Sequence, residues 1–117
     1  MNEKRRYIRV KPKPEEPVEI QLVGSNFIDI LNAKDISEGG VGIIVDHDFE
    51  GCDIGGLIDI IITLPKKKTF KVKGRIIHKH ITDSHFFGVE FINISEEARS
   101  MIKEYVQKRL EEAKEIK

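Results

Sequence analysis

Apolar and polar residues alternate with a period of two through six short runs of the sequence, and this pattern restricts the fold most. Successive side chains of a strand point to opposite faces, so each run predicts a strand with one buried face. The expected strands are 18–23, 27–34, 41–45, 58–64, 70–81 and 86–92. Turn-forming residues separate them, as in Gly24-Ser25-Asn26 and in the loop predicted over 35–40. Six strands at such short spacing indicate an antiparallel barrel or a sandwich.

The pattern then changes to the period of an α-helix. Ser95 is a good N-cap, and the two glutamates that follow it lie where the helix dipole favours negative charge. The apolar residues between Ala98 and Leu110 fall on one stripe of such a helix. We therefore expect a helix over 95–117 that packs its apolar stripe against the open side or end of the sheet.

The first seventeen residues differ from both patterns. Pro12, Pro14 and Pro17 favour extended backbone and remove hydrogen-bond donors, and few apolar side chains are present to offset the entropy lost on ordering. We expect a basic arm over 1–17 that is mobile without a ligand. At 117 residues the whole chain fits one domain, divided into the arm, a β-structure over 18–94 and a helix over 95–117.

Charge is balanced overall but unevenly placed. Lys+Arg and Asp+Glu each number 20, so the net charge is zero and the overall basic character typical of DNA- and RNA-binding proteins is absent. Six basic residues nevertheless crowd positions 4–13. A basic arm on a neutral body suits a small anionic ligand better than a long duplex. We therefore expect neither DNA nor RNA as a partner.

Cysteine content and hydropathy indicate a soluble cytoplasmic protein. Cys52 is the only cysteine, so an intramolecular disulfide is impossible. The N-terminus lacks the apolar stretch of a signal peptide, and the longest apolar run, near 57–64, is too short to span a bilayer. No membrane insertion is expected.

Arginines of the arm form the first candidate site. Arg5, Arg6 and Arg9 carry planar, permanently charged guanidinium groups, which match phosphate oxygens in pairs. The same group matches the O6 and N7 acceptors of guanine and can stack on a base. An arm that simply remains solvated is the alternative interpretation of this run.

The loop between the second and third expected strands forms the second candidate site. Asp35 can accept hydrogen bonds from N1–H and the N2 amino group of guanine, and Ser37 adds a short donor or acceptor. Gly39 and Gly40 allow a tight turn and a close approach of a ligand. Ordinary turn chemistry, with Asp and Ser side chains capping a glycine loop, is the alternative.

Together the two motifs resemble those of the PilZ domain family. The motifs are Arg5-x-x-x-Arg9 and Asp35-x-Ser37-x-x-Gly40, in this order. A third segment, Gly88-Val89-Glu90-Phe91, resembles the family's glycine-valine-x-phenylalanine in the last strand. The resemblance covers the chain from about residue 4 to about residue 110. It implies a six-stranded antiparallel β-barrel with a C-terminal α-helix packed on it.

The resemblance also implies a function. PilZ domains are receptors for the bacterial second messenger cyclic di-GMP, and they regulate processes such as motility, biofilm formation and polysaccharide synthesis. Carried over by position, Arg5 and Arg9 are the paired arginines, with Arg6 beside them, and Asp35, Ser37 and Gly40 are the second half of the site. Ligand binding is expected to order the arm and create a surface for a downstream protein.

Two further residues follow from the resemblance. His78 takes the place on the fifth strand where family members often carry tryptophan, and its imidazole can stack on guanine. Lys4 precedes the first paired arginine, a position implied to influence whether one nucleotide or a stacked pair binds. The chain has no tryptophan.

Other functions fit the sequence less well. Asp46-His47-Asp48 and His78-Lys79-His80 contain metal-ligand types, but no zinc-type spacing exists, so no metal and no cofactor is expected. No nucleophile elbow or P-loop accompanies Ser37, so we expect a protein that is not an enzyme. The phenylalanines fall on strand faces that look internal, which disfavours single-stranded nucleic acid binding. A nucleotide-independent adaptor, contacting protein through the helix or the lysine turn 66–68, stays open as the alternative.

Overall fold

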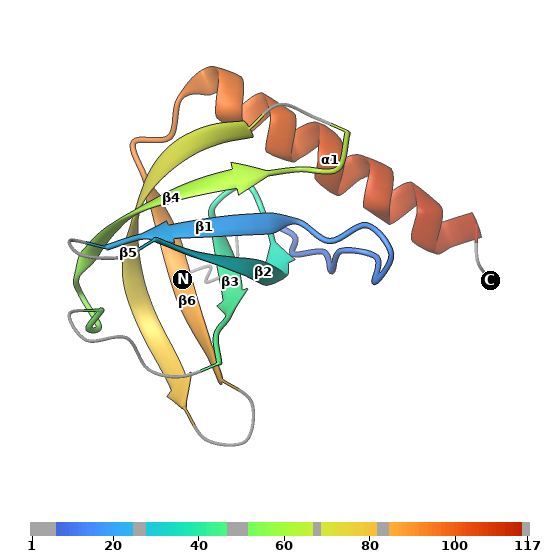
Figure 1. Cartoon of the computed structure of the whole chain (residues 1–117). Helices are drawn as coiled ribbons and strands as arrows, with labels where there is room; N and C mark the ends of the chain where they lie inside the picture. The colour runs from blue at the N-terminus through green and yellow to red at the C-terminus, as the bar shows by residue number, and fades with distance from the viewer. Residues whose placement is uncertain (1–6, 25–27, 47–51, 67–68, 82–84, 116–117) are drawn as a thin grey trace, which may run out of the picture.

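The computed structural model describes residues 7–24, 28–46, 52–66, 69–81 and 85–115. In these ranges six strands precede one helix (Figure 1). The elements are β1 (Glu19–Val23), β2 (Ile28–Ile36), β3 (Gly40–Ile44), β4 (Leu57–Thr63), β5 (Thr69–Ile81), β6 (His85–Ile92) and α1 (Glu96–Glu115). The six strands and the helix that the sequence predicts are thus confirmed, with ends that differ by up to two residues.

The strands close into a barrel, which settles the choice between barrel and sandwich. The order around the barrel is β1-β2-β3-β6-β5-β4, with β4 returning to β1, and every neighbouring pair is antiparallel. The inward side chains are those of the alternating apolar positions, such as Ile20, Ile43, Ile60 and Phe87, which are fully buried. The period-two pattern therefore supplies one continuous core with no open edge strand among the described residues.

One strand boundary was predicted wrongly. The sequence predicts a loop over 35–40, whereas β2 continues through Ile36 and β3 begins at Gly40. The reason is a β-bulge: Ala33 pairs with Ile43, but Asp35, not Lys34, is the next residue to find a partner. An extra residue breaks the alternation, so the strand looks finished two residues before it ends.

A second bulge lies in β5. Ile76 pairs with Val89, and the next pair is His78 with Gly88, so Ile77 is the extra residue. A side chain two positions beyond an inward residue normally points inward as well, and a bulge reverses this. Both bulges have the same effect, because Asp35 stands two positions after the inward Ala33 and His78 stands two positions after the inward Ile76. Each turns a polar side chain to the outside of the barrel.

The helix α1 closes one end of the barrel (Figure 1). Its expected N-cap is confirmed, since the backbone N–H of Ala98 donates to Ser95 Oγ at 3.1 Å. Its apolar stripe is core, with Ile102, Tyr105 and Val106 buried among the barrel residues. Among the described helical residues, none form a stretch long and apolar enough to cross a membrane.

Residues 7–17 lie against α1 and β2. Val10 and Ile36 exchange two backbone hydrogen bonds of 3.0 Å, which attaches the arm to the end of β2. The guanidinium of Arg109 donates to the carbonyl of Lys11 at 2.8 Å, and Lys13 Nζ lies 3.2 Å from a Glu112 carboxylate oxygen. The mobility expected of the ligand-free arm stays a prediction.

Candidate functional site

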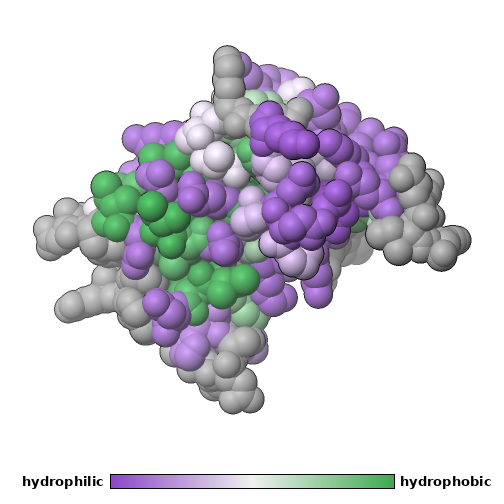
Figure 2. Space-filling view, turned by 45° about the vertical axis from the view of Figure 1, so that its right-hand side comes forward, coloured by the Kyte–Doolittle hydropathy of each residue, from purple (hydrophilic) through white to green (hydrophobic). Residues whose placement is uncertain are grey.

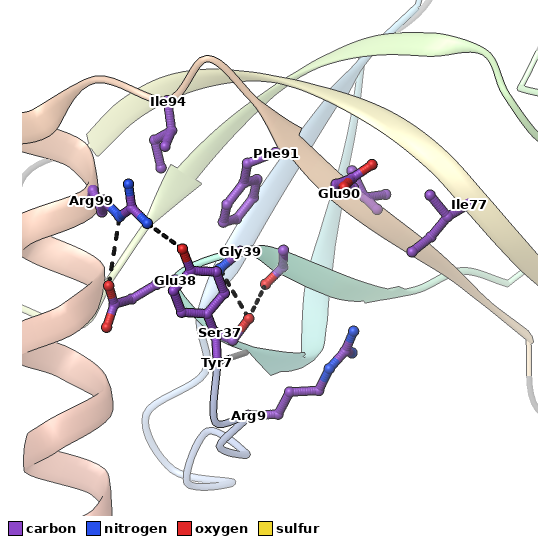
Figure 3. Close-up of a pocket in the computed structure, with 12 residues that line it drawn as sticks. Tyr7, Arg9, Ser37, Glu38, Gly39, Ile77, Glu90, Phe91, Ile94 and Arg99 are labelled. Carbon is purple, nitrogen blue, oxygen red and sulfur yellow. Dashed lines mark hydrogen bonds and ion pairs between the residues drawn. The ribbon is translucent and has the colours of Figure 1, made fainter. Parts of the chain in front are cut away.

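A cavity of about 400 Å³ opens where the arm, the β2–β3 loop, β6 and the first turn of α1 meet (Figure 3). The arm contributes Tyr7 and Arg9, and α1 contributes Arg99. The loop and the sheet supply the remaining lining residues, which are Ser37, Glu38, Gly39, Gly40, Ile77, Val89, Glu90, Phe91 and Ile94. Arg9 of the first candidate site and the glycine loop of the second therefore border one cavity.

The Arg9–Asp35 ion pair joins the two motifs directly. Arg9 Nη1 donates to Asp35 Oδ1 at 3.0 Å, although 26 positions separate the two residues. The bulge of β2 turns Asp35 outward, and the bridge between Val10 and Ile36 brings Arg9 beside it. Lys34 Nζ lies 3.8 Å from the other carboxylate oxygen. A fixed carboxylate flanked by two cations thus stands next to the cavity.

Ser37 holds the β2–β3 loop in shape. Its side chain is buried, its hydroxyl accepts a hydrogen bond of 3.1 Å from the Gly39 N–H, and it donates to the Gly40 carbonyl at 3.5 Å. The Ser37 N–H also donates to this carbonyl, at 2.9 Å. The turn chemistry considered from the sequence is therefore present, and the hydroxyl reaches the cavity wall while serving the turn.

A row of residues across four strands forms a second part of the site. Asp35 pairs with Gly42, Gly42 with Gly88, and Gly88 with His78. A Cβ on Gly42 would lie 2.9 Å from Asp35 Oδ1, and one on Gly88 would lie 2.3 Å from His78 Nε2. The carboxylate therefore lies over Gly42 and the imidazole over Gly88, and these two glycines are neighbours on adjacent strands, roughly 5 Å apart.

The sequence-predicted site residues fall into three groups. Arg9, Ser37, Gly39 and Gly40 line the cavity and Asp35 borders it. His78 is absent from the cavity lining among the described residues; Ile77, the bulge residue, takes that place, and His78 lies over Gly88 in the adjoining row. Arg5 and Arg6 lie outside the described residues.

Sequence reasoning missed a cluster of three residues at the cavity. Arg99 Nη2 donates to the hydroxyl of Tyr7, and its guanidinium carbon lies 5.4 Å from the centre of the Tyr7 ring. Arg99 Nε also lies 3.6 Å from Glu38 Oε1 (Figure 3). Tyr7 sits within the arginine run and Glu38 within the glycine loop, so both had a positional signal. Arg99 had none, because it reads as one more charge on the polar side of a helix.

These features define a small antiparallel barrel with a candidate ligand site built from an N-terminal basic segment and the β2–β3 loop. The sequence model of the family described as "PilZ domain" matches residues 3–108. The chain therefore belongs to the PilZ domain family.

One further protein sequence and several solved structures are similar to this chain. An uncharacterised protein of Aquifex aeolicus (strain VF5) is 33% identical over 121 residues, which cover 93% of this chain and 52% of that protein. This chain thus spans about half the length of that relative. The PilZ domain of YcgR from Escherichia coli, solved with c-di-GMP, superimposes with a TM-score of 0.77 at 19% identity, covering 97% of this chain and 96% of that one. The K. pneumonia MrkH–c-di-GMP complex gives 0.85 at 16% identity, covering 99% and 57%.

Proposed function

We propose that this protein is a receptor for cyclic di-GMP that is not an enzyme and that signals to a downstream protein in the cytoplasm. The observation that carries the proposal is the meeting of Arg9 and Asp35 at the cavity, in a chain that belongs to the PilZ family. An arm that merely stays solvated would not be expected to pair Arg9 with a carboxylate 26 positions away. The YcgR and MrkH structures with a similar fold contain c-di-GMP.

The chemistry of the ligand matches the groups present. Cyclic di-GMP carries two phosphates and two guanines. Arg9 offers a planar fork for a phosphate or for the O6 and N7 edge of guanine. Asp35 offers acceptors for N1–H and the N2 amino group. Gly42 and Gly88 provide a floor without side chains, so a flat base can approach the backbone, with the His78 imidazole beside it.

Calorimetric titration of cyclic di-GMP into the purified protein tests the proposal. We expect a dissociation constant in the micromolar range or tighter, about −8 kcal/mol. Arg9→Ala should weaken binding by about 10- to 150-fold, since a charge-assisted contact contributes about 1.5–3 kcal/mol. Lys11→Ala is the matched control: it removes an exposed arm cation outside the cavity and keeps the carbonyl that Arg109 contacts.

Cyclic di-AMP serves as the control ligand, because adenine lacks the O6 and N2 groups of guanine while the phosphates are the same. We expect no binding of it. The stoichiometry of the cyclic di-GMP titration distinguishes one nucleotide from a stacked pair per chain. Binding that survives Arg9→Ala, or equal heats for the two ligands, would contradict the proposed recognition.

An adaptor that binds protein without nucleotide is the second candidate, and one observation favours it. Ile28 and Ile30 of β2 are 66% and 60% exposed, and β1 residues Val23 and Gln21 lie directly opposite them. Figure 2 shows apolar side chains gathered on this side of the barrel, next to a hydrophilic helix. Such a patch is typical of interaction surfaces. Absence of any heat with cyclic di-GMP at millimolar concentration would favour the adaptor.

A further inference from the structure

The arm follows α1 from its first turn to its last turn. Tyr7 contacts Arg99, the carbonyl of Lys11 accepts from Arg109, and Lys13 pairs with Glu112. The lengths agree, since six extended residues and thirteen helical residues each span about 20 Å. The arm therefore runs parallel to α1 and contacts it through three residues, one near each end of the helix and one in between.

Arg99 provides the contact nearest the cavity. Its guanidinium donates to the Tyr7 hydroxyl and lies 5.4 Å from the ring centre, a distance at which a cation and an aromatic ring attract each other. Glu38 balances the guanidinium charge at 3.6 Å, and the Arg99 side chain is 41% exposed. The Tyr7 ring lies over Gly39, where a Cβ would come within 2.7 Å of ring atom Cδ2. Arm, loop and helix thus meet at one aromatic ring.

This contact restrains Arg9 from its N-terminal side. Val10, the next residue, is already fixed by its two hydrogen bonds to Ile36. With Tyr7 held by Arg99, the four-residue stretch from Tyr7 to Val10, which contains Arg9, is anchored at both ends. Without Arg99 the segment before Val10 would keep only the ion pair of Arg9 with Asp35, and ordering its first residues would oppose ligand binding.

We propose that Arg99 is a positioning residue for the nucleotide site, which holds Tyr7 over Gly39 and so preorganises Arg9 for the ligand. The inference rests on the proposed function for its effect on affinity, whereas the latch formed by Arg99, Tyr7 and Glu38 consists of contacts between protein groups alone. Arg99 itself acts through Tyr7 and makes no required contact with the nucleotide.

Two measurements on the full chain test the latch. The first is cyclic di-GMP affinity by calorimetry, where Arg99→Ala should raise the dissociation constant about tenfold, the effect expected for the loss of one such contact. The second is the rate at which trypsin cleaves the Arg9–Val10 bond without ligand, read by mass spectrometry, which should rise several-fold. Lys103→Ala, one turn further along α1 and exposed, should change neither.

Further variants separate positioning from a general structural effect. Arg99→Lys keeps the charge but loses the planar fork, so it should restore only part of the affinity. In a Tyr7→Ala background, Arg99→Ala should have no further effect on affinity or cleavage, because the partner through which it acts is gone. Far-UV circular dichroism and the melting temperature check that α1 remains folded in every variant.

The outcomes distinguish this inference from the proposed function. If the wild-type protein binds and Arg99→Ala binds equally well with unchanged cleavage, the latch is refuted and the receptor stands. If Arg99→Ala weakens binding to the same extent with Tyr7→Ala present, Arg99 contacts the ligand directly and the positioning role is refuted. If the wild-type protein binds no cyclic di-GMP, the receptor is refuted, and cleavage at Arg9–Val10 alone decides the latch: faster in Arg99→Ala supports it, unchanged overturns it.

Discussion

Gly40→Ala tests whether the last residue of the β2–β3 motif serves the ligand or the fold. Gly40 begins β3 and pairs with Glu90 of β6. A Cβ at this position would lie 2.3 Å from the carbonyl oxygen of Val89 and 3.4 Å from the Cα of Glu90. Both are backbone atoms, so no side-chain rotation can relieve the overlap. The absence of a side chain is therefore a condition for β3 and β6 to pair here.

The size of the effect follows from the overlap. Ordinary carbon–oxygen contacts need roughly 1 Å more space, so β3 and β6 must separate locally by about that distance. Overpacking of this kind costs about 1–3 kcal/mol. The hydrogen bond from Phe91 N–H to the Gly39 carbonyl, 2.9 Å long, lies next to the overlap, and its loss would add about 1 kcal/mol. We expect a total loss of about 2–4 kcal/mol, or about 8–16 °C in melting temperature.

Gly42→Ala is the matched control in the same strand. Its Cβ would meet Asp35 Oδ1 at 2.9 Å, the end of a side chain that can rotate. The cost should stay below about 1 kcal/mol, the worth of a partly exposed ion pair such as Arg9–Asp35. Replacing glycine by alanine also lowers the entropy of the unfolded chain, but this gain is common to both variants and cancels in the comparison.

Urea unfolding followed by far-UV circular dichroism measures both variants. Similar slopes against urea concentration would show that the free energies of unfolding can be compared directly. The reasoning is refuted if Gly40→Ala unfolds within about 1 kcal/mol of the wild type, or if Gly42→Ala is destabilised to the same extent. The first result would mean that β3 and β6 tolerate a side chain at position 40, and the second that the overlap with backbone atoms does not account for the loss of stability.

Three other changes probe stability. A hydrogen bond from Lys13 is the main cause that lowers the pKa of Glu112 from 4.5. Its stabilising effect is therefore present above about pH 4.5 and lost as pH falls through the lowered value; Glu112→Gln should destabilise the protein at neutral pH only, as thermal melts at several pH values would show. Ser37→Ala should cost about 1–2 kcal/mol in urea unfolding, because buried loop amide and carbonyl groups lose their partner. Deletion of the bulge residue Ile77 should leave a cooperatively folded barrel by circular dichroism, whereas deletion of Ile61 from regular β4 should not, because it turns core residues outward.

The alternation was sufficient for the six strands because the core depends on a simple rule, although by itself it left barrel and sandwich open. Residues such as Ile20, Ile60 and Phe87 alternate with polar neighbours, and burial of one face is the strongest local signal a strand can carry. The N-cap at Ser95 was equally predictable, because its hydroxyl acts on the backbone three residues away. Both features depend on neighbours in the sequence and need no knowledge of tertiary contacts.

The site was predictable only in part, because its geometry depends on contacts between distant residues. The role of Arg99 requires that the arm lies along α1, a fact with no trace in the helical pattern. The exchange of Ile77 for His78 in the cavity wall requires a shift of one residue in the pairing of β5 with β6. A period-two pattern cannot reveal such a shift when the residues around it, Ile76 and Ile77, are both apolar.

The two bulges explain why the irregular positions of this barrel and its candidate site coincide. A regular β2 would direct the carboxylate of Asp35 into the core beside Ala33, and a regular β5 would do the same with the imidazole of His78. Burying an unpaired charge or polar ring there would cost several kcal/mol. One extra residue in each strand instead turns Asp35 and His78 outward in the same row, while Ile36 and Ile76 lie inside. The chain thus retains a regular apolar core and places two polar groups over a glycine floor on the outside of the barrel.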